Sequence, residues 1–305
     1  MAKEAIALAQ KLDTSKLTYP AYFSEKLDGV PVRIMVQIDH NGVPDVHCRT
    51  RQWEFAISCN SDALRFVQMN THIMRPGYTY NFVAEVTHKT FKGFKDISGV
   101  VRRQSTQEGL IFNLFDFDAA QNSEGISGLA FEKRIMVLDH WHYPENFRVI
   151  DQIRYTDQAT LDDALENTPI GKYQEGWVLR SGDAPFKPGT RHWDYQKVVK
   201  EPTIDLWIVG MEEGVGKFAG GVGRFEASYF GETIGIGPGK QTTAERNELW
   251  REWVQWHGAI KSGYKTTPWK RMACIKYKPD DGYNALRQPT FQCWRDDKLV
   301  ADDAC

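Results

Sequence analysis

The chain has 305 residues, of which 41% are hydrophobic and 26% charged, a composition typical of an ordered globular protein and unlike that of a disordered tail or a fibre. This length suffices for one large domain or two modest ones, each with its own core. The 38 Lys and Arg residues nearly balance the 40 Asp and Glu residues, so a surface that binds a polyanion must come from uneven placement of charge.

The five cysteines include no Cys-x-x-Cys pair, which argues against a zinc ribbon or a disulfide framework and fits a reducing cytosol. Residues 1–12 carry charges among their apolar positions, which predicts a short amphipathic helix and not a secretory signal. The sequence contains no run of about 18 apolar residues, so we expect no membrane span.

Strand patterns dominate the first two thirds of the chain. Alternating and β-branched residues predict a hairpin of strands at 29–37 and 45–49. A helix is expected at 61–69, where Leu64 and Val67 have helical spacing. Further strands are expected at 81–86, 109–116, 147–153 and 176–179. Many strands with few helices predict an α+β fold, in which helices pack on antiparallel sheets.

The pattern changes near Pro202, and we place a domain boundary at residue 203. Short strands follow, beginning at 206–210, together with one helix that starts at a capping box at Thr242 and ends before Gly258. These signals predict a small β-barrel that carries one helix.

Several short motifs place charged side chains in or beside apolar strands. The first is Lys26-x-Asp28-Gly29, at the start of a strand. Glu85 lies within an apolar strand, where an unpaired carboxylate is costly to bury, so it suggests a cation or a ligand as its partner. Glu175-Gly176 opens a similar strand. The remaining motifs are Lys197 with Lys200, and Arg295-x-Asp297-Lys298 near the C-terminus.

Taken in order, these motifs resemble the nucleotidyltransferase signatures of the ATP-dependent DNA ligases, which RNA ligases and mRNA capping enzymes share in part. The likeness extends over most of the chain, because residues 48–50, 94–103 and 113–116 are similar to further ligase elements. The resemblance implies an antiparallel-sheet nucleotidyltransferase (adenylation) domain over residues 1–203 and a small OB-fold β-barrel over residues 204–305. Few residues precede Lys26, so the chain resembles the minimal two-domain ligases of phages and some bacteria.

The resemblance also implies a reaction. Lys26 would take AMP from ATP and release pyrophosphate, the AMP would pass to the 5′-phosphate of a nick, and the 3′-hydroxyl would displace it to seal the nick. ATP and Mg²⁺ (or Mn²⁺) are the expected cofactors, and nicked double-stranded DNA is the expected partner. A monomer in the cytoplasm of a bacterial or phage-infected host cell is expected, with no membrane contact.

By the same resemblance, Lys26 is the expected nucleophile, Glu175 and Glu85 are the expected metal ligands, and Phe115 is expected to stack on adenine. Arg295, with its two motif partners, would orient the pyrophosphate leaving group. The expected contacts to ATP or AMP are Glu25, Lys26, Leu27, Asp28, Gly29, Arg33, Arg49, Glu85, Phe115, Lys197, Lys200, Arg295, Asp297 and Lys298.

Two positions depart from the family pattern. Many ligases have an arginine five residues after the motif I lysine, where this chain has Pro31. Arg33 lies on the same strand face as Pro31 and could reach the same ligand. Motif V usually reads Lys-x-Lys, whereas two valines separate Lys197 from Lys200, so either lysine could fill the essential position.

The nucleophilic lysine must lose its proton before it attacks. A free lysine has a pKa of about 10.4 and is almost entirely charged at pH 7. We expect Mg²⁺ and nearby cations to lower the pKa of Lys26, because like charge disfavours the ammonium form.

Residues 261–278 predict a surface that binds a polyanion. Cations neutralise phosphates, and the interleaved aromatic side chains of Tyr264, Trp269 and Tyr277 can pack on sugars or bases. The expected DNA-binding residues are Arg49, Arg51, Lys261, Lys265, Lys270, Arg271, Lys276 and Lys278. The alternative for each group is a solvated hairpin face.

Other functions within and outside the superfamily stay open. A capping guanylyltransferase would share motif I, the barrel and the Arg-x-Asp-Lys element, but would label with GTP. An RNA ligase is expected to lack that last element. From a different class, the chain could be a catalytically inactive module that binds nucleic acid through its barrel, and it would then form no nucleotide adduct.

Overall fold

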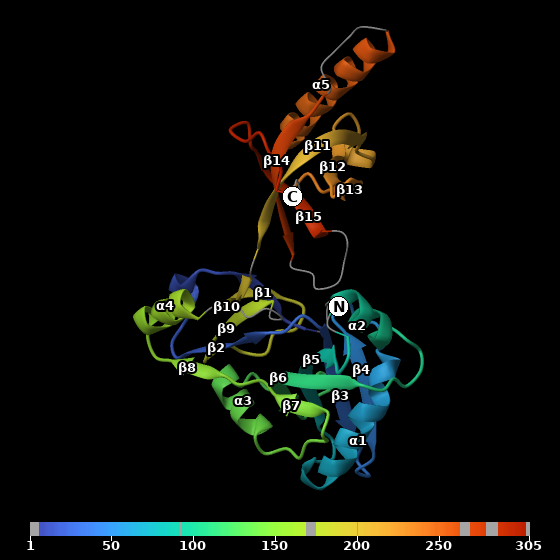
Figure 1. Ribbon diagram of the computed structural model, residues 1–305. Helices are drawn as coiled ribbons and strands as arrows, with labels where there is room; N and C mark the ends of the chain where they lie inside the picture. The colour runs from blue at the N-terminus through green and yellow to red at the C-terminus, as the bar shows by residue number, and fades with distance from the viewer. Residues whose placement is uncertain are drawn as a thin grey trace. The chain divides into compact units, whose positions relative to one another are not determined.

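The computed structural model describes residues 6–91, 93–168, 175–199, 201–262, 269–278 and 286–302. The chain separates into two compact units, unit 1 (Met1–Val199) and unit 2 (Lys200–Cys305), both drawn in Figure 1. The boundary expected at residue 203 coincides with the first residue of β11 (Thr203–Glu213).

Unit 1 is built on two five-stranded sheets, with the strand orders β1-β10-β9-β2-β8 and β4-β3-β5-β6-β7. The strands of the first sheet are β1 (Leu8–Lys11), β2 (Ala21–Lys26), β8 (Ile153–Tyr155), β9 (Gly176–Ser181) and β10 (Arg191–Val199). Those of the second are β3 (Val30–Ile38), β4 (Pro44–Thr50), β5 (Thr79–His88), β6 (Leu110–Ala120) and β7 (Phe147–Val149). Neighbouring strands are antiparallel, except that β1 runs parallel to β10 and β6 parallel to β7.

The second sheet buries one face beneath helices α1 (Asn60–Asn70) and α2 (Phe94–Val101), which lie beside it in Figure 1. Alternate residues of β3 and β5, such as Ile34 and Phe82, form this core with Phe66 of α1. Because side chains alternate along a strand, Arg33 and Glu85 lie on the opposite face.

The first sheet divides its side chains in the same way. Phe23 and Leu179 pack with Leu161 of α4 (Gln158–Asn167) on one face. On the other face, Tyr22 packs with Phe131 of α3 (Phe131–Leu138). Ser24 and Lys26 share the face of Tyr22, because they follow it by two and four positions on β2.

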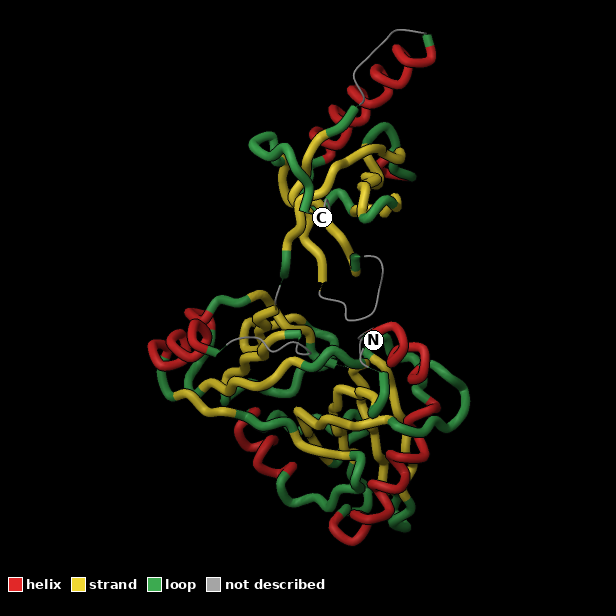
Figure 2. The backbone as a smooth tube through the Cα atoms, in the orientation of Figure 1, coloured by secondary structure: helices red, strands yellow, loops and turns green. Residues whose placement is uncertain are grey.

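Unit 2 is a curled five-stranded sheet with the order β13-β12-β11-β14-β15. Its further strands are β12 (Val222–Tyr229), β13 (Glu232–Ile236), β14 (Arg271–Lys278) and β15 (Arg287–Trp294). Gly237, just after β13, exchanges backbone hydrogen bonds of 3.0 and 2.9 Å with Pro289 and Phe291 of β15, so the two edges of the sheet meet and form a barrel. Helix α5 (Thr243–Lys261) follows β13. Figure 2 shows the strands of this unit in yellow with α5 in red.

The α+β fold class is confirmed, and so are the first hairpin, the helix at 61–69 and the capping box at Thr242. The prediction of a helix at residues 1–12 is wrong for residues 6–12, which are the part that the structure describes. Leu8–Lys11 is a strand, because β1 pairs its backbone with the edge of β10 and this pairing overrides local helix propensity. The helix expected to end before Gly258 continues to Lys261.

Single-turn 3-10 helices connect some of these elements, at Thr14–Lys16, Ile57–Cys59, Thr71–Ile73 and Gly216–Phe218. Across the described ranges, no helix has both the length and the apolar character needed to cross a bilayer.

Candidate active site

A pocket of unit 1 lies between the two sheets, with Lys26 in its wall. The first sheet contributes side chains from β2 and β9, and the second contributes Glu85 and Phe115. The lining residues are Ser24, Glu25, Lys26, Leu27, Glu85, Phe115, Phe131, Ile150, Gln152, Val178, Arg180 and Tyr195. The structure therefore brings together five residues that the motifs predicted for nucleotide contact: Glu25, Lys26, Leu27, Glu85 and Phe115.

Lys26 lies between two carboxylates. Its Nζ donates a hydrogen bond to the Glu175 carboxylate, and the Glu175 backbone N–H donates to the Lys26 carbonyl at 3.1 Å. Burial lowers the pKa of Lys26, but the negative charges of Glu175 and Glu85 outweigh burial, so the pKa is raised overall. The two carboxylates thus favour the protonated ammonium form of Lys26.

Glu85 projects from β5 toward the same lysine. Its Oε1 accepts a hydrogen bond from the Gly29 backbone N–H at 3.0 Å. Burial raises the pKa of Glu85 to about 7, with Lys26 opposing the shift and Glu175 adding to it. A Cβ atom on Gly29 would lie 2.4 Å from the Val86 carbonyl oxygen, which explains why the residue after Asp28 is a glycine.

The raised pKa of Glu85 predicts a pH dependence of stability. The unfolded carboxyl titrates near 4.5 and the folded one near 7, so the folded state holds the extra proton between these values. The free energy of unfolding should therefore fall as pH rises through this window, by up to about 3 kcal/mol. Glu85→Gln should remove this decrease, as measured by urea unfolding at a series of pH values.

A matched control is Asp157→Asn. Hydrogen bonds from Thr160 lower the pKa of Asp157 below its ordinary 3.8, so this variant should change the stability profile only at more acidic pH. The prediction would be contradicted if the free energy of unfolding changed with pH in the same way for the wild type and for Glu85→Gln between pH 4.5 and 7.

The two candidate motif V lysines differ in their placement. Lys197 of β10 pairs with Val178 of β9, which pairs with Ser24 of β2. Residues directly opposite one another in a sheet share a face, so Lys197 lies on the face of Ser24 and Lys26. Lys200 lies outside the described residues.

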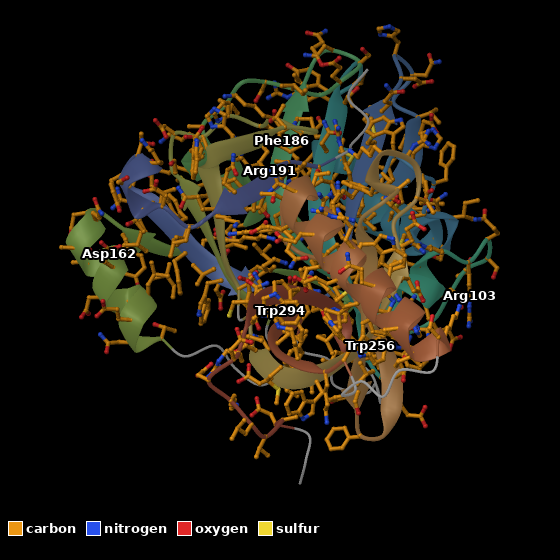
Figure 3. The ribbon with its side chains drawn as sticks, turned by 90° about the horizontal axis from the view of Figure 1, so that it is seen from above. Arg103, Asp162, Phe186, Arg191, Trp256 and Trp294 are labelled. Carbon is orange, nitrogen blue, oxygen red and sulfur yellow. The ribbon has the colours of Figure 1, made fainter. Side chains whose placement is uncertain are left out.

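Arg33 lies on the same face as Pro31 and Glu85, but it is not among the residues that line the pocket. Only 3% of its surface is exposed. Its guanidinium donates to Asn81 Oδ1 at 2.8 Å and to the Glu124 carbonyl at 3.0 Å, and it lies 5.4 Å from the ring centre of Phe186, which Figure 3 labels. Burial lowers the pKa of Arg33 to about 10.

A buried charged network supports the floor of the pocket, and the motifs did not predict its role. Asp116 accepts hydrogen bonds from Arg134 Nε at 2.9 Å and from Arg180. Burial alone would raise the pKa of Asp116, but these two arginines lower it. The guanidinium of Arg180 lies 4.2 Å from the Tyr195 ring centre and 5.4 Å from that of Phe115. The network thus holds the Arg180 guanidinium beside the rings of Phe115 and Tyr195 in the pocket lining.

The Arg-x-Asp-Lys motif forms a second charged cluster, in unit 2. Arg295 Nε and Nη2 each donate to the Asp297 carboxylate at 3.0 Å. Asp205 Oδ2 accepts from Arg295 Nη1 at 2.8 Å and from Lys298 Nζ at 2.7 Å. Lys298 also donates to Asp302 Oδ1 at 2.7 Å. Asp205 is only 4% exposed. The motifs did not predict its contact with Arg295, because it lies far from Arg295 along the chain.

The C-terminal cations do not lie on one face of unit 2. Arg271 shares a face of β14 with the core residues Ala273 and Ile275, whereas Lys276 and Lys278 point to the other side. Arg271 pairs with Asp296 at 3.3 Å and lies over Trp294, labelled in Figure 3. Lys276 pairs with Glu201.

The other predicted DNA-binding cations of unit 2 are less engaged with acids. Lys270 Nζ lies 4.2 Å above the Trp207 ring centre. Lys261 ends α5 and is exposed. Lys265 and Tyr264 lie outside the described residues.

The acidic groups of the pocket can be tested as metal ligands. In the described part of the chain, no group of three or more His, Cys, Asp or Glu side chains is placed to hold a metal ion. Glu85 and Glu175 flank Lys26 and offer carboxylate oxygens, the donors that Mg²⁺ prefers. This set fits an ion held by one or two carboxylates together with substrate phosphates.

Comparisons with known proteins support this view of the fold. No protein-family model matches the chain. A DNA ligase of Haloarcula marismortui is 31% identical over 127 residues, which make up 41% of this chain and 23% of that ligase. The match therefore spans less than a quarter of the curated relative's length.

Solved structures match over nearly the whole chain. One described as Pmar-Lig_Pre has a TM-score of 0.73 at 17% identity and covers 97% of this chain and 68% of its own. A structure from work on DNA binding by Lig E DNA ligases with a minimal scaffold has a TM-score of 0.66 at 18% identity, covering 96% and 99%. The bacteriophage T7 ATP-dependent DNA ligase, in complex with ATP, has a TM-score of 0.54 at 15% identity, covering 96% and 99%. The chain therefore has the fold of the ATP-dependent DNA ligases, a nucleotidyltransferase domain followed by an OB-fold domain, as the order of its motifs predicted.

Proposed function

We propose that this chain is an ATP-dependent DNA ligase that seals nicks between a 5′-phosphate and a 3′-hydroxyl in duplex DNA. The observation that carries the proposal is the position of Lys26, in a pocket between the two sheets and flanked by Glu85 and Glu175. We assign residues 1–203 to the adenylation domain and residues 204–305 to the OB-fold domain.

In the first step, Lys26 Nζ attacks the α-phosphorus of ATP. A phosphorus–nitrogen bond forms, the bond to the bridging oxygen breaks, pyrophosphate leaves and the amine loses its proton. A 5′-phosphate oxygen of the nick then attacks the same phosphorus and releases Lys26. Finally, the 3′-hydroxyl attacks the 5′-phosphate, and AMP leaves as the phosphodiester forms.

We propose separate roles for the residues of unit 1 and for the Arg-x-Asp-Lys cations of unit 2. Phe115 supports adenine by its ring, and Lys197 neutralises charge on the α-phosphate from the same sheet face as Lys26. Arg295 and Lys298 orient the pyrophosphate leaving group in the first step. Glu85 and Glu175 would hold Mg²⁺, which neutralises phosphate charge when it is bound.

The carboxylates beside Lys26 also control its proton. While Glu175 accepts the hydrogen bond of Nζ, the raised pKa of Lys26 keeps the amine protonated and unreactive. A cation held by Glu175 would draw this carboxylate away from the ammonium and would add a positive charge beside it. Both changes would lower the pKa of Lys26 and would favour the neutral amine that attacks.

We further propose a monomer that acts on nicked double-stranded DNA in the cytoplasm of a bacterial or phage-infected cell. The half-buried Arg49 and the exposed Lys261 support contact with phosphates. The two-domain fold, which resembles two solved ligases over most of their length, supports action without further subunits.

The experiment that tests this function uses purified chain freed of bound AMP and incubated with Mg²⁺ and ATP, GTP or NAD. Intact mass and peptide mapping should show one AMP group on Lys26 with ATP alone. The labelled protein should then seal a nicked duplex. A GMP adduct would indicate a capping guanylyltransferase, an adduct from NAD would overturn the cofactor, and no adduct would refute catalysis.

A further inference from the structure

The turn at residues 51–55, which follows β4, exposes two large aromatic side chains. Trp53 is 39% exposed and Phe55 is 49% exposed. The motifs assign no role to either residue. Their exposed faces are available to a partner.

The backbone of this turn holds Trp53 in an unusual conformation. Trp53 N–H donates to the Thr50 carbonyl at 2.9 Å, and Thr50 N–H donates to the Glu54 carbonyl at 2.8 Å. The φ angle of Trp53 is 67°, in the left-handed region that glycine and asparagine adopt at least cost and a bulky residue rarely adopts. A tryptophan at this position is a local strain, and such strain concentrates where a side chain has a function.

The two rings bracket a cation. The guanidinium carbon of Arg49 lies 3.3 Å from the ring centre of Phe55 and 5.5 Å from that of Trp53. Arg49 Nη1 also donates to the Trp53 carbonyl at 3.2 Å. Arg51 is exposed within the same turn. The turn therefore presents aromatic faces and positive charge side by side, the combination that contacts sugars or bases together with phosphates.

The turn lies at the end of the second sheet that holds the active-site residues. Thr50 of β4 pairs with Val32 of β3, while the adjoining Pro31 pairs with Glu85 of β5. The chain continues from Thr50 directly into the turn. The turn therefore lies near the start of β3, which directly follows Gly29. Gly29 and Glu85 are hydrogen-bonded to each other beside Lys26, so the turn adjoins the place where a 5′-phosphate must meet AMP.

We propose that Trp53 and Phe55 pack against the sugars or bases of the DNA strand beside the nick, while Arg49 and Arg51 contact its phosphates. This inference rests on the proposed ligase function and adds a contact surface to it. Nucleic acid is the occupant that fits, because it offers bases and sugars to the two rings and phosphates to the guanidinium that lies between them. An apolar protein segment would offer no anion to Arg49.

The test measures the affinity of the full chain for a nicked duplex over a range of salt concentrations. Trp53→Ala and Phe55→Ala should each weaken binding roughly tenfold at every salt concentration, because a ring releases no counterions. Arg49→Ala and Arg51→Ala should instead reduce the slope of log affinity against log salt by about one each. Trp53→Phe, which keeps a ring, should restore most of the affinity.

The matched control is Met136→Ala, which removes a side chain of α3 that is 55% exposed and should leave affinity unchanged. Thermal unfolding of each variant checks the fold. Unchanged affinity in both aromatic variants would overturn the inference, and so would a reduced salt slope in Trp53→Ala, because the rings would then act only by holding Arg49. Failure of the proposed function would be distinguishable, because the wild-type chain would then form no adduct with ATP. The affinity for DNA can be measured whether or not AMP is bound to the chain.

Discussion

Lys26→Ala and Lys26→Arg are expected to abolish the AMP adduct completely. Alanine removes the amine, and the arginine guanidinium stays charged and delocalised at every accessible pH, so it cannot act as the nucleophile. Lys197 lies on the same sheet face but two strands away from Lys26, and it should not substitute. The measurement is the intact mass after incubation with ATP and Mg²⁺, followed by peptide mapping.

Two further variants test whether loss of the adduct is specific to Lys26. Lys16→Ala removes an exposed lysine of the same unit and should leave the adduct at full yield. Lys197→Ala should slow adduct formation by roughly 100-fold through lost charge neutralisation, without moving the adduct from Lys26. An adduct of equal yield on another lysine in Lys26→Ala would show that the nucleophile had been misassigned.

The sequence was most informative where chemistry and local structure coincide. Glu85 could be recognised because it places a charge on an otherwise apolar strand, and burial of such a charge requires a partner. Lys26 could be recognised from its Lys-x-Asp-Gly motif and from the order of the other motifs along the chain. Lys26 ends β2, and the short segment through Gly29 leads into β3, whose pairing with β5 brings Glu85 close to the lysine. Alternation along β2 likewise determines that Lys26 faces the pocket.

Contacts between segments far apart along the chain could not be predicted from the sequence. Asp205 and Arg295 meet only because β11 and the segment after β15 lie together in the barrel, and no local pattern announces this. For the same reason, residues 261–278 looked free of acids, whereas Glu201 and Asp296 supply acids from elsewhere in the chain. Pairing of Leu8–Lys11 with β10 is a further long-range contact that local propensity could not predict.

One missed element did leave a local signal. Helix α4 begins at Asp157, whose side chain accepts a hydrogen bond from the Thr160 backbone N–H at 3.0 Å. An aspartate at this position before a helical run is a typical N-cap. Asp157 and the helical run that follows it are therefore sufficient to predict α4.

Asp205→Ala is expected to slow formation of the AMP adduct by roughly 100-fold while leaving the final sealing step almost intact. Asp205 is the acid that Arg295 and Lys298 share, through bonds of 2.8 and 2.7 Å. Without it, Arg295 keeps Asp297 and Lys298 keeps Asp302, but the two cations no longer have a common anchor. A pair of cations that must be placed on one leaving group then loses its preorganisation, a loss comparable to that of one oxyanion-hole donor.

The two half-reactions separate this positioning role from a structural one. Adduct formation is followed with ATP and Mg²⁺, and sealing is followed with nicked DNA that already carries a 5′-adenylate. Asp302 is the second partner of Lys298 and also accepts a hydrogen bond from the Asp205 backbone N–H at 2.7 Å. Asp302→Asn removes its charge but keeps a side-chain oxygen, so it should slow adduct formation by no more than roughly tenfold. If Asp205→Ala slowed both half-reactions equally, together with a lower unfolding temperature, Asp205 would serve the stability of the barrel and not the placement of Arg295 and Lys298.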